Sequence, residues 1–138
     1  MKNPLEVNIE INSTIKMVWD AWVEEDSIKI WNVPFFDWHC PFVRNDIKTG
    51  GNFNFRMEKL DSSEGFDYMG KYLLVIPFAR IETLQQDGRK SIINFEENGD
   101  SVKLTEQFEP DEQTDLSLQK KFCQLVLNKF KDFIENQY

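Results

Sequence analysis

The residues best suited to chemistry in this sequence include the segment around its only histidine, Asp37-Trp38-His39-Cys40-Pro41. A histidine and a cysteine can share a metal ion, but a zinc site needs three or four ligands. The sequence holds no second histidine and one other cysteine, the distant Cys123. A general-base role for His39 would need an orienting carboxylate, and Asp37 is near it only along the chain. We therefore expect no metal and no cofactor here, and we expect His39 to bond to backbone groups in a packed loop.

Glu106 is the second chemically notable residue, because period-two alternation places its carboxylate on an apolar face. The residues in phase with it are Val102, Leu104 and Phe108. A carboxylate on an inward face is costly unless it is paired or protonated, and such groups are enriched at functional sites. Two interpretations stay open. Either Glu106 serves a ligand, or it is satisfied structurally, by a bond to Tyr68, Tyr72 or an arginine, or by a bulge that turns it outward.

A long amphipathic helix over residues 115–136 is the element around which the rest is organised. Its apolar residues recur at spacings of three and four, which is typical of a helix with one buried side. They are Leu118, Phe122, Leu125, Val126, Phe130 and Phe133. Near the start of the chain, residues 5–11 alternate as a strand. A helix with Ser13 as its N-cap follows, and then a shorter helix capped by Asp26 or Ser27.

Residues 42–109 read as a series of antiparallel strands joined by hairpins. The strands are expected at residues 42–46, 52–58, 66–76, 79–85, 90–96 and 101–109, with an irregular packed loop over residues 32–41. Asp87-Gly88 and Asn98-Gly99 are strong hairpin turns. Gly70, inside a strand whose residues 66, 68, 70, 72, 74 and 76 are in phase, indicates a bulge or bend. The order predicts one α+β domain over residues 1–138, a curved sheet wrapped around the long helix.

Composition narrows the function classes. The formal net charge of −8 argues against nucleic acid and against anionic membrane surfaces. No run approaches the roughly 18 apolar residues of a membrane span, and residues 1–12 lack the apolar centre of a signal peptide. With two distant cysteines, we expect free thiols and a cytoplasmic location. Twelve Phe and four Trp are many for 138 residues, and such rings fill a core or line a pocket.

The element order and several segments together resemble the START-like superfamily of helix-grip domains. Within it, the chain is similar to the branch related to the activator of the heat-shock-protein-90 ATPase. The segments that carry the resemblance are residues 11–22 (I-N-S-T-I-K-M-V-W-D-A-W), Trp31-Asn32, residues 37–41, 45–57 (N-D-I-K-T-G-G-N-F-N-F-R-M), 65–70 (G-F-D-Y-M-G) and 105–110 (T-E-Q-F-E-P). The chain departs from it at Ser13-Thr14, where relatives often have Ala-Pro. The resemblance implies the fold, and the superfamily includes lipid carriers, hormone receptors, cyclases and co-chaperone domains.

Such a fold tends to leave a cavity between the sheet and the long helix, and a filled core is the alternative. The candidate lining residues are Trp31, Trp38, His39, Phe55, Met57, Phe66, Tyr68, Glu106, Phe122 and Val126. The leading hypothesis is a domain that binds a small hydrophobic or amphipathic molecule there. A co-chaperone-like module with a protein partner is second, and an enzyme of the cyclase or dehydratase kind is third. The protein is expected to be a monomer or a homodimer.

Overall fold

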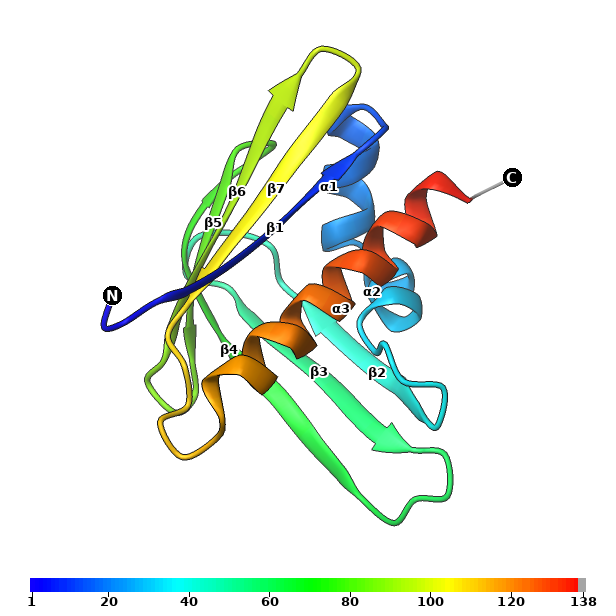
Figure 1. The fold of residues 1–138 in the computed structure, drawn as a ribbon, viewed down its shortest axis with the longest axis vertical. Coiled ribbons are helices and arrows are strands. Elements are labelled where there is room, and N and C mark those ends of the chain that lie inside the picture. The colour runs from blue at the N-terminus through cyan, green and yellow to red at the C-terminus, as the bar shows by residue number, and fades with distance from the viewer. Residues whose placement is uncertain (137–138) are drawn as a thin grey trace.

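The computed structural model describes residues 1–136, which form a curved antiparallel sheet and three helices (Figure 1). The elements are β1 (Leu5–Ile11), α1 (Ile15–Val23), α2 (Glu25–Trp31), β2 (Trp38–Asn45), β3 (Asn52–Lys59), β4 (Gly65–Ile76), β5 (Arg80–Gln85), β6 (Lys90–Asn98), β7 (Ser101–Phe108) and α3 (Leu116–Glu135). The seven strands lie in the order β1-β7-β6-β5-β4-β3-β2. The predicted helix-grip architecture is confirmed, with α3 crossing the concave face of the sheet.

The ends of the helices show where the sequence interpretation was right and where it was wrong. Asp115 caps α3, because its Oδ1 accepts a hydrogen bond of 3.0 Å from the backbone N–H of Leu118. At α1 the N-cap is Thr14, whose hydroxyl accepts from Met17 N–H at 3.2 Å, and the expected cap at Ser13 is wrong. α2 follows α1 directly and begins at Glu25, before the two residues proposed as its cap.

β2 begins earlier than expected, at Trp38, so the predicted loop over residues 32–41 ends sooner than the sequence suggested. Two prolines in this window, Pro34 and Pro41, favour a loop in the sequence, but β2 is an edge strand, where the missing N–H of a proline is tolerated. The register with β3 shifts between His39 and Phe42, and Pro41 lies within that irregularity. His39 is consequently an exposed strand residue and not part of a packed loop.

β4 carries the bend that the sheet needs. The register with β5 shifts between Tyr72 and Leu74, so Leu73 is an extra residue in the strand. Tyr72 faces Thr83 and Val75 faces Ile81, which means that Leu74 and Ile76 lie on the opposite face from Tyr72 and are out of the predicted phase. The bulge lies three residues beyond Gly70.

Gly70 is needed for another reason, the close approach of β5. A Cβ atom at this position would lie 2.3 Å from the carbonyl oxygen of Leu84. Any side chain there would therefore push β4 away from β5.

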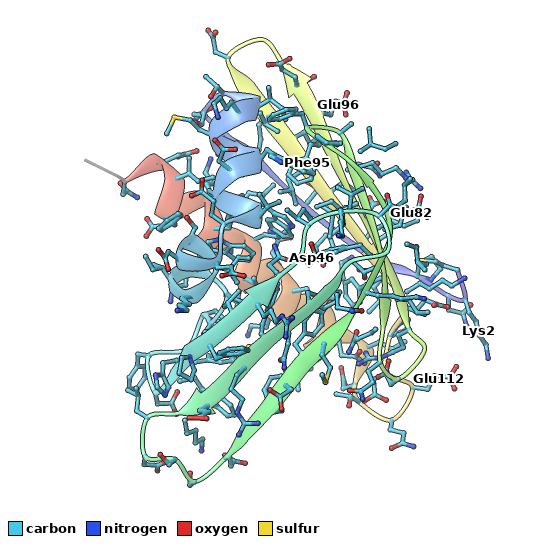
Figure 2. The ribbon with its side chains drawn as sticks, turned by 180° about the vertical axis from the view of Figure 1, so that it is seen from behind. Lys2, Asp46, Glu82, Phe95, Glu96 and Glu112 are labelled. Atoms are coloured by element: carbon cyan, nitrogen blue, oxygen red, sulfur yellow. The ribbon has the colours of Figure 1, made fainter. Side chains whose placement is uncertain are left out.

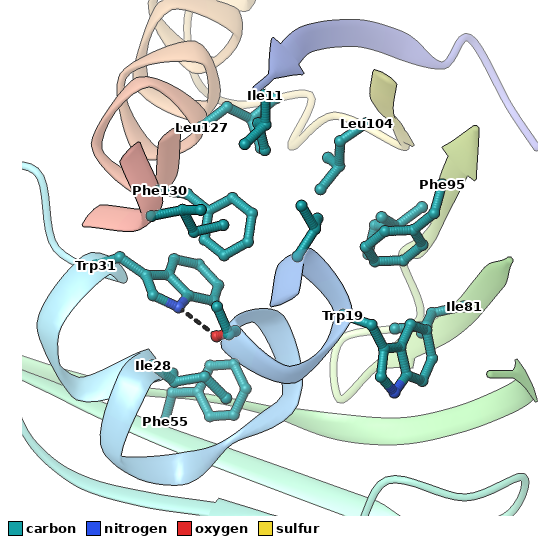
Figure 3. Packing of buried hydrophobic residues seen from close by; sticks show 14 of the residues in the cluster. Ile11, Trp19, Ile28, Trp31, Phe55, Ile81, Phe95, Leu104, Leu127 and Phe130 are labelled. Carbon is teal, nitrogen blue, oxygen red and sulfur yellow. Dashed lines mark hydrogen bonds between the residues drawn. The ribbon is translucent and has the colours of Figure 1, made fainter. Parts of the chain in front are cut away.

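The hydrophobic core is concentrated where α1, α2 and the C-terminal half of α3 meet the sheet (Figure 3). Trp22 and Trp31 stack at a centroid distance of 4.7 Å, and the Phe130 ring meets both edge-on at 5.0 and 4.9 Å. The indole N–H of Trp31 donates to the backbone oxygen of Ala21 at 2.8 Å, so its only polar group is satisfied. These contacts hold the C-terminal half of α3 against α1 and α2.

The sides of the fold are also tied by polar contacts. Lys131 Nζ on α3 donates to the Glu10 carbonyl oxygen at 2.6 Å, which helps cover the edge strand β1. Figure 2, a view from behind, shows Lys2 and Glu112 near one another, and their charged atoms are 3.5 Å apart. Glu82 and Glu96, also labelled there, alternate with the buried Ile81 and Phe95 and therefore lie on the outer face of the sheet.

Candidate functional site

A cavity of about 800 Å³ lies between the concave face of the sheet and the N-terminal half of α3. Strands β3 to β7 supply its floor, and α2, the α2–β2 loop and α3 supply its other walls. The cavity exists because α3 packs along β1 and against α1 and α2, and makes few contacts with the central strands of the sheet. The size is that of a small-molecule pocket.

Most of the cavity wall is apolar and aromatic. Phe53, Phe55, Tyr68 and Tyr72 on β3 and β4 form a continuous group of rings, with neighbouring centroids 5.1 to 5.9 Å apart. The alternation of β3 produces this wall, because Phe53, Phe55 and Met57 point inward together. On the opposite side, Val126 and Phe122 of α3 complete it.

The rim of the cavity is apolar as well, and partly open to solvent. Two ring pairs join segments that are far apart in the sequence: Phe35 with Phe122 at 5.6 Å, and Trp38 with Phe66 at 5.9 Å. Phe66 and Phe122 remain 47% and 40% exposed, and Leu118 is 61% exposed. Leaving such residues in water forgoes burial energy, which is a common property of binding surfaces.

Glu106 points into this cavity from β7, as the alternation predicts. The register of β7 with β1 and β6 is unbroken at Glu106, so no bulge turns it outward. Within residues 1–136 its carboxylate has no hydrogen bond or ion pair, and the hydroxyl of Tyr72 instead donates to Asn45 Oδ1. Burial raises the pKa of Glu106 from 4.5 to about 7. At neutral pH this carboxyl can therefore either donate or accept a proton.

Two further titratable groups lie near Glu106. Burial, and secondarily the charge of Glu106, raises the pKa of the Tyr68 hydroxyl and that of the Cys123 thiol, so both groups stay neutral. The hydroxyls of Thr83 and Ser91, 2.5 Å apart, add a buried polar pair on the floor. The cavity thus combines apolar walls with a small polar patch.

All of the sequence-predicted cavity residues except His39 line this space. His39 lies on β2 with its Nε2 3.9 Å from Glu58 Oε1, on an exposed part of the strand. Sequence reasoning missed Thr83, Ser91 and Cys123. The two hydroxyl residues could have been found, because they are in phase with the buried Ile81 and Ile93.

Neither a metal centre nor a membrane-spanning helix is found in the part of the chain that the structure describes. Among residues 1–136, no group of three or more His, Cys, Asp or Glu side chains is arranged to hold a metal ion. None of the helices in that range is both long enough and apolar enough to cross a membrane.

A long helix gripped by a curved antiparallel sheet, with two short helices at one end, defines a START-like helix-grip protein. Residues 12–135 match the family model described as Activator of Hsp90 ATPase homolog 1-like protein, and the chain belongs to this family. No curated protein matches the chain significantly in sequence.

Solved structures agree with the family assignment. The solution structure of the AHSA1-like protein from Aeromonas hydrophila is 31% identical, with a TM-score of 0.87 over 95% of this chain and 92% of the other. One from Cytophaga hutchinsonii is 36% identical, with a TM-score of 0.86 over 97% and 93%. A crystal structure from Chromobacterium violaceum has a TM-score of 0.84 over 98% and 99%, and at 16% identity this shows the fold alone.

Proposed function

We propose that the protein binds a small hydrophobic or amphipathic molecule in the cavity between the sheet and α3. The observation that carries the proposal is the cavity itself, about 800 Å³ in volume, with aromatic walls and a few convergent polar groups. Ligand sites in proteins generally have this composition. Its apolar surface would be covered by the body of the ligand, while Glu106 and Tyr68 would orient a polar group.

The exposed rim supports the same proposal. A ligand entering between Phe66 and Phe122 would bury surface that is now in contact with water, at roughly 25 cal/mol per Å². The rim side chains come from the α2–β2 loop, the first residues of β2 and β4, and the N-terminal half of α3, so small movements of these segments would widen the entrance.

Native mass spectrometry of freshly purified protein, followed by organic extraction, tests the proposal. We expect a co-purifying small molecule, or a gain in thermal stability with members of a hydrophobic ligand panel. Val126→Trp would fill the cavity and abolish both effects, whereas Lys120→Trp, at an exposed position of the same helix, would leave them intact. An empty protein that no panel member stabilises, with the two variants behaving alike, would refute ligand binding.

A second candidate function, a protein-interaction module, is favoured by Phe36. This ring is 95% exposed and lies outside the cavity lining, so a small ligand in the cavity would not cover it. The family is named for an activator of the Hsp90 ATPase, which makes a chaperone of that type the partner to test. Stimulation of its ATPase rate that is lost in Phe36→Ser would support this role, and no stimulation by the wild-type protein would exclude it for that partner.

A further inference from the structure

The charges that line the cavity are unbalanced toward the negative side. The acidic lining residues are Asp67, Glu106, Glu109 and Asp111, and the basic ones are Arg89 and Lys90. Arg89 is already engaged, because its Nε donates to Asp87 Oδ2 at 2.8 Å, and Lys90 is exposed at the start of β6. A pocket lined this way attracts cations and repels anions, and the net charge of −8 on the whole chain acts in the same direction.

Glu106 is the one acidic lining residue that has no partner among residues 1–136. Asp67 Oδ2 accepts a hydrogen bond of 3.2 Å from Arg56 Nη1. The Glu109 carboxylate accepts from the backbone N–H groups of Lys2 and Lys90. The Asp111 carboxylate accepts from the backbone N–H of Gln113 and the hydroxyl of Thr114. The carboxylate of Glu106 therefore gains the most from an incoming hydrogen-bond donor or positive charge.

We propose that the cavity is selective for amphipathic amines, in which an apolar body fills the aromatic space and a protonated nitrogen pairs with Glu106. This inference rests on the proposed ligand-binding function and specifies the chemical class of the ligand.

The surroundings of Glu106 suit an ammonium group in two further ways. The hydroxyls of Thr83 and Ser91 lie on the same face of the sheet, since Ser91 is two positions from Ile93, the cross-strand partner of Glu106. An ammonium has three donors, and these neutral oxygens can accept the ones that Glu106 does not take. The rings of Tyr68, Phe53 and Phe55 supply π-faces that attract cations.

A ligand with a carboxylate at the same place would be disfavoured. Two carboxylates brought together in this largely apolar cavity would repel each other, and one of them would have to take up a proton. A neutral alcohol would be accepted without either the ion pair or the repulsion. The expected order of affinity for ligands of one shape is therefore amine first, alcohol second and acid last.

Three naphthalene derivatives with the same body test this order: 2-naphthylmethylamine, 2-naphthylmethanol and 2-naphthoic acid. At about pH 8, where Glu106 with its pKa near 7 is mostly charged, calorimetry should give the amine about tenfold tighter binding than the alcohol. Glu106→Gln should remove this advantage and leave the alcohol affinity within about twofold. Glu96→Gln, an exposed glutamate on the adjacent strand β6, should change neither affinity.

If Glu106→Gln does not fold, the amine proposal can be tested on the wild-type protein by measuring the pKa of the Glu106 carboxyl by NMR, with and without each ligand. Amine binding should lower the pKa of the Glu106 carboxyl, and alcohol binding should not. The other ionisable groups coupled to this region are Tyr68 on β4, Cys123 on α3, and Arg89 and Asp87 in the β5–β6 turn, and the first two are neutral at these pH values.

The outcomes separate the two proposals. Equal binding of amine and alcohol, tighter binding of the acid, or a co-purified ligand without a basic nitrogen would overturn the amine inference and leave ligand binding standing. If none of the three compounds binds and the purified protein holds no ligand, both proposals fail. An amine preference that survives Glu106→Gln would overturn the role of Glu106.

Discussion

The two halves of α3 are built differently although one amphipathic pattern runs through both. At the C-terminal half, Leu127 and Phe130 are completely buried, and the Phe130 ring packs against Trp22 of α1 and Trp31 of α2. At the N-terminal half, Leu118 and Phe122 are 61% and 40% exposed and face a cavity. The difference indicates that the two halves have different roles. The C-terminal half, around Leu127 and Phe130, stabilises the fold, and we call it the closed end. The N-terminal half, around Leu118 and Phe122, leaves apolar surface exposed to the cavity, and we call it the open end.

The largest expected effect is at the closed end. Phe130→Ala would remove a ring that packs on Trp22 and Trp31, and we expect a loss of about 3–5 kcal/mol in the free energy of unfolding. Urea denaturation measures it. A loss below about 1 kcal/mol would show that the closed end is not the main source of stability.

The second effect concerns Glu106 and depends on pH. Because its pKa is higher in the folded protein, at about 7, than its ordinary value of 4.5, the folded state retains this proton where the unfolded chain has lost it. The stabilisation is present in full well below pH 4.5 and is lost as the pH rises through 7, by about 3 kcal/mol.

Glu106→Gln isolates this contribution. From about pH 4.5 to pH 8, the wild-type protein should lose stability relative to the Gln variant by that amount, in denaturation experiments at matched ionic strength. The difference between the two proteins cancels the titration of unrelated groups. A difference that does not vary with pH would mean that Glu106 is already paired.

The third prediction concerns what stabilises the N-terminal half of α3. Since packing there is sparse, the cap at Asp115 should matter, and Asp115→Ala should cost about 1 kcal/mol. Hydrogen exchange should accelerate in the first turns of α3 and remain slow around Phe130. Uniform acceleration along the whole helix would contradict the division between the halves.

The smallest effect on stability is expected at the rim. Phe122→Ala would remove a ring that is 40% exposed, and we expect a cost of about 1 kcal/mol or less, well below that at Phe130. Retention of a hydrophobic ligand should nevertheless decrease, as measured by thermal shift with the ligand panel. Equal destabilisation by Phe122→Ala and Phe130→Ala would remove the distinction between the two ends.

The sequence predicted the parts of this comparison that depend on local periodicity. The spacing of three and four placed Phe122, Val126 and Phe130 on one side of a helix, and the alternation in β7 placed Glu106 on the inward face. Periodicity could not say which part of the helix would be covered. That depends on α1 and α2, which fill the space at one end only.

The errors came from features that sequence periodicity does not encode. Pro34 and Pro41 suggested a loop, but β2 is an edge strand and accommodates Pro41, which leaves His39 exposed beside Glu58. The extra residue Leu73 reversed the faces of Leu74 and Ile76, and such a shift is visible only in the pairing with β5.

The most direct test of the account is an NMR titration of isotope-labelled protein with 2-naphthylmethanol, the neutral probe of the series. We expect the chemical-shift changes to concentrate at the cavity, on Thr83, Ser91, Glu106 and Cys123, with little change around Leu127 and Phe130. No change at saturating probe, or changes confined to the outer surface around Phe36, would contradict the assignment of the open end as a ligand cavity.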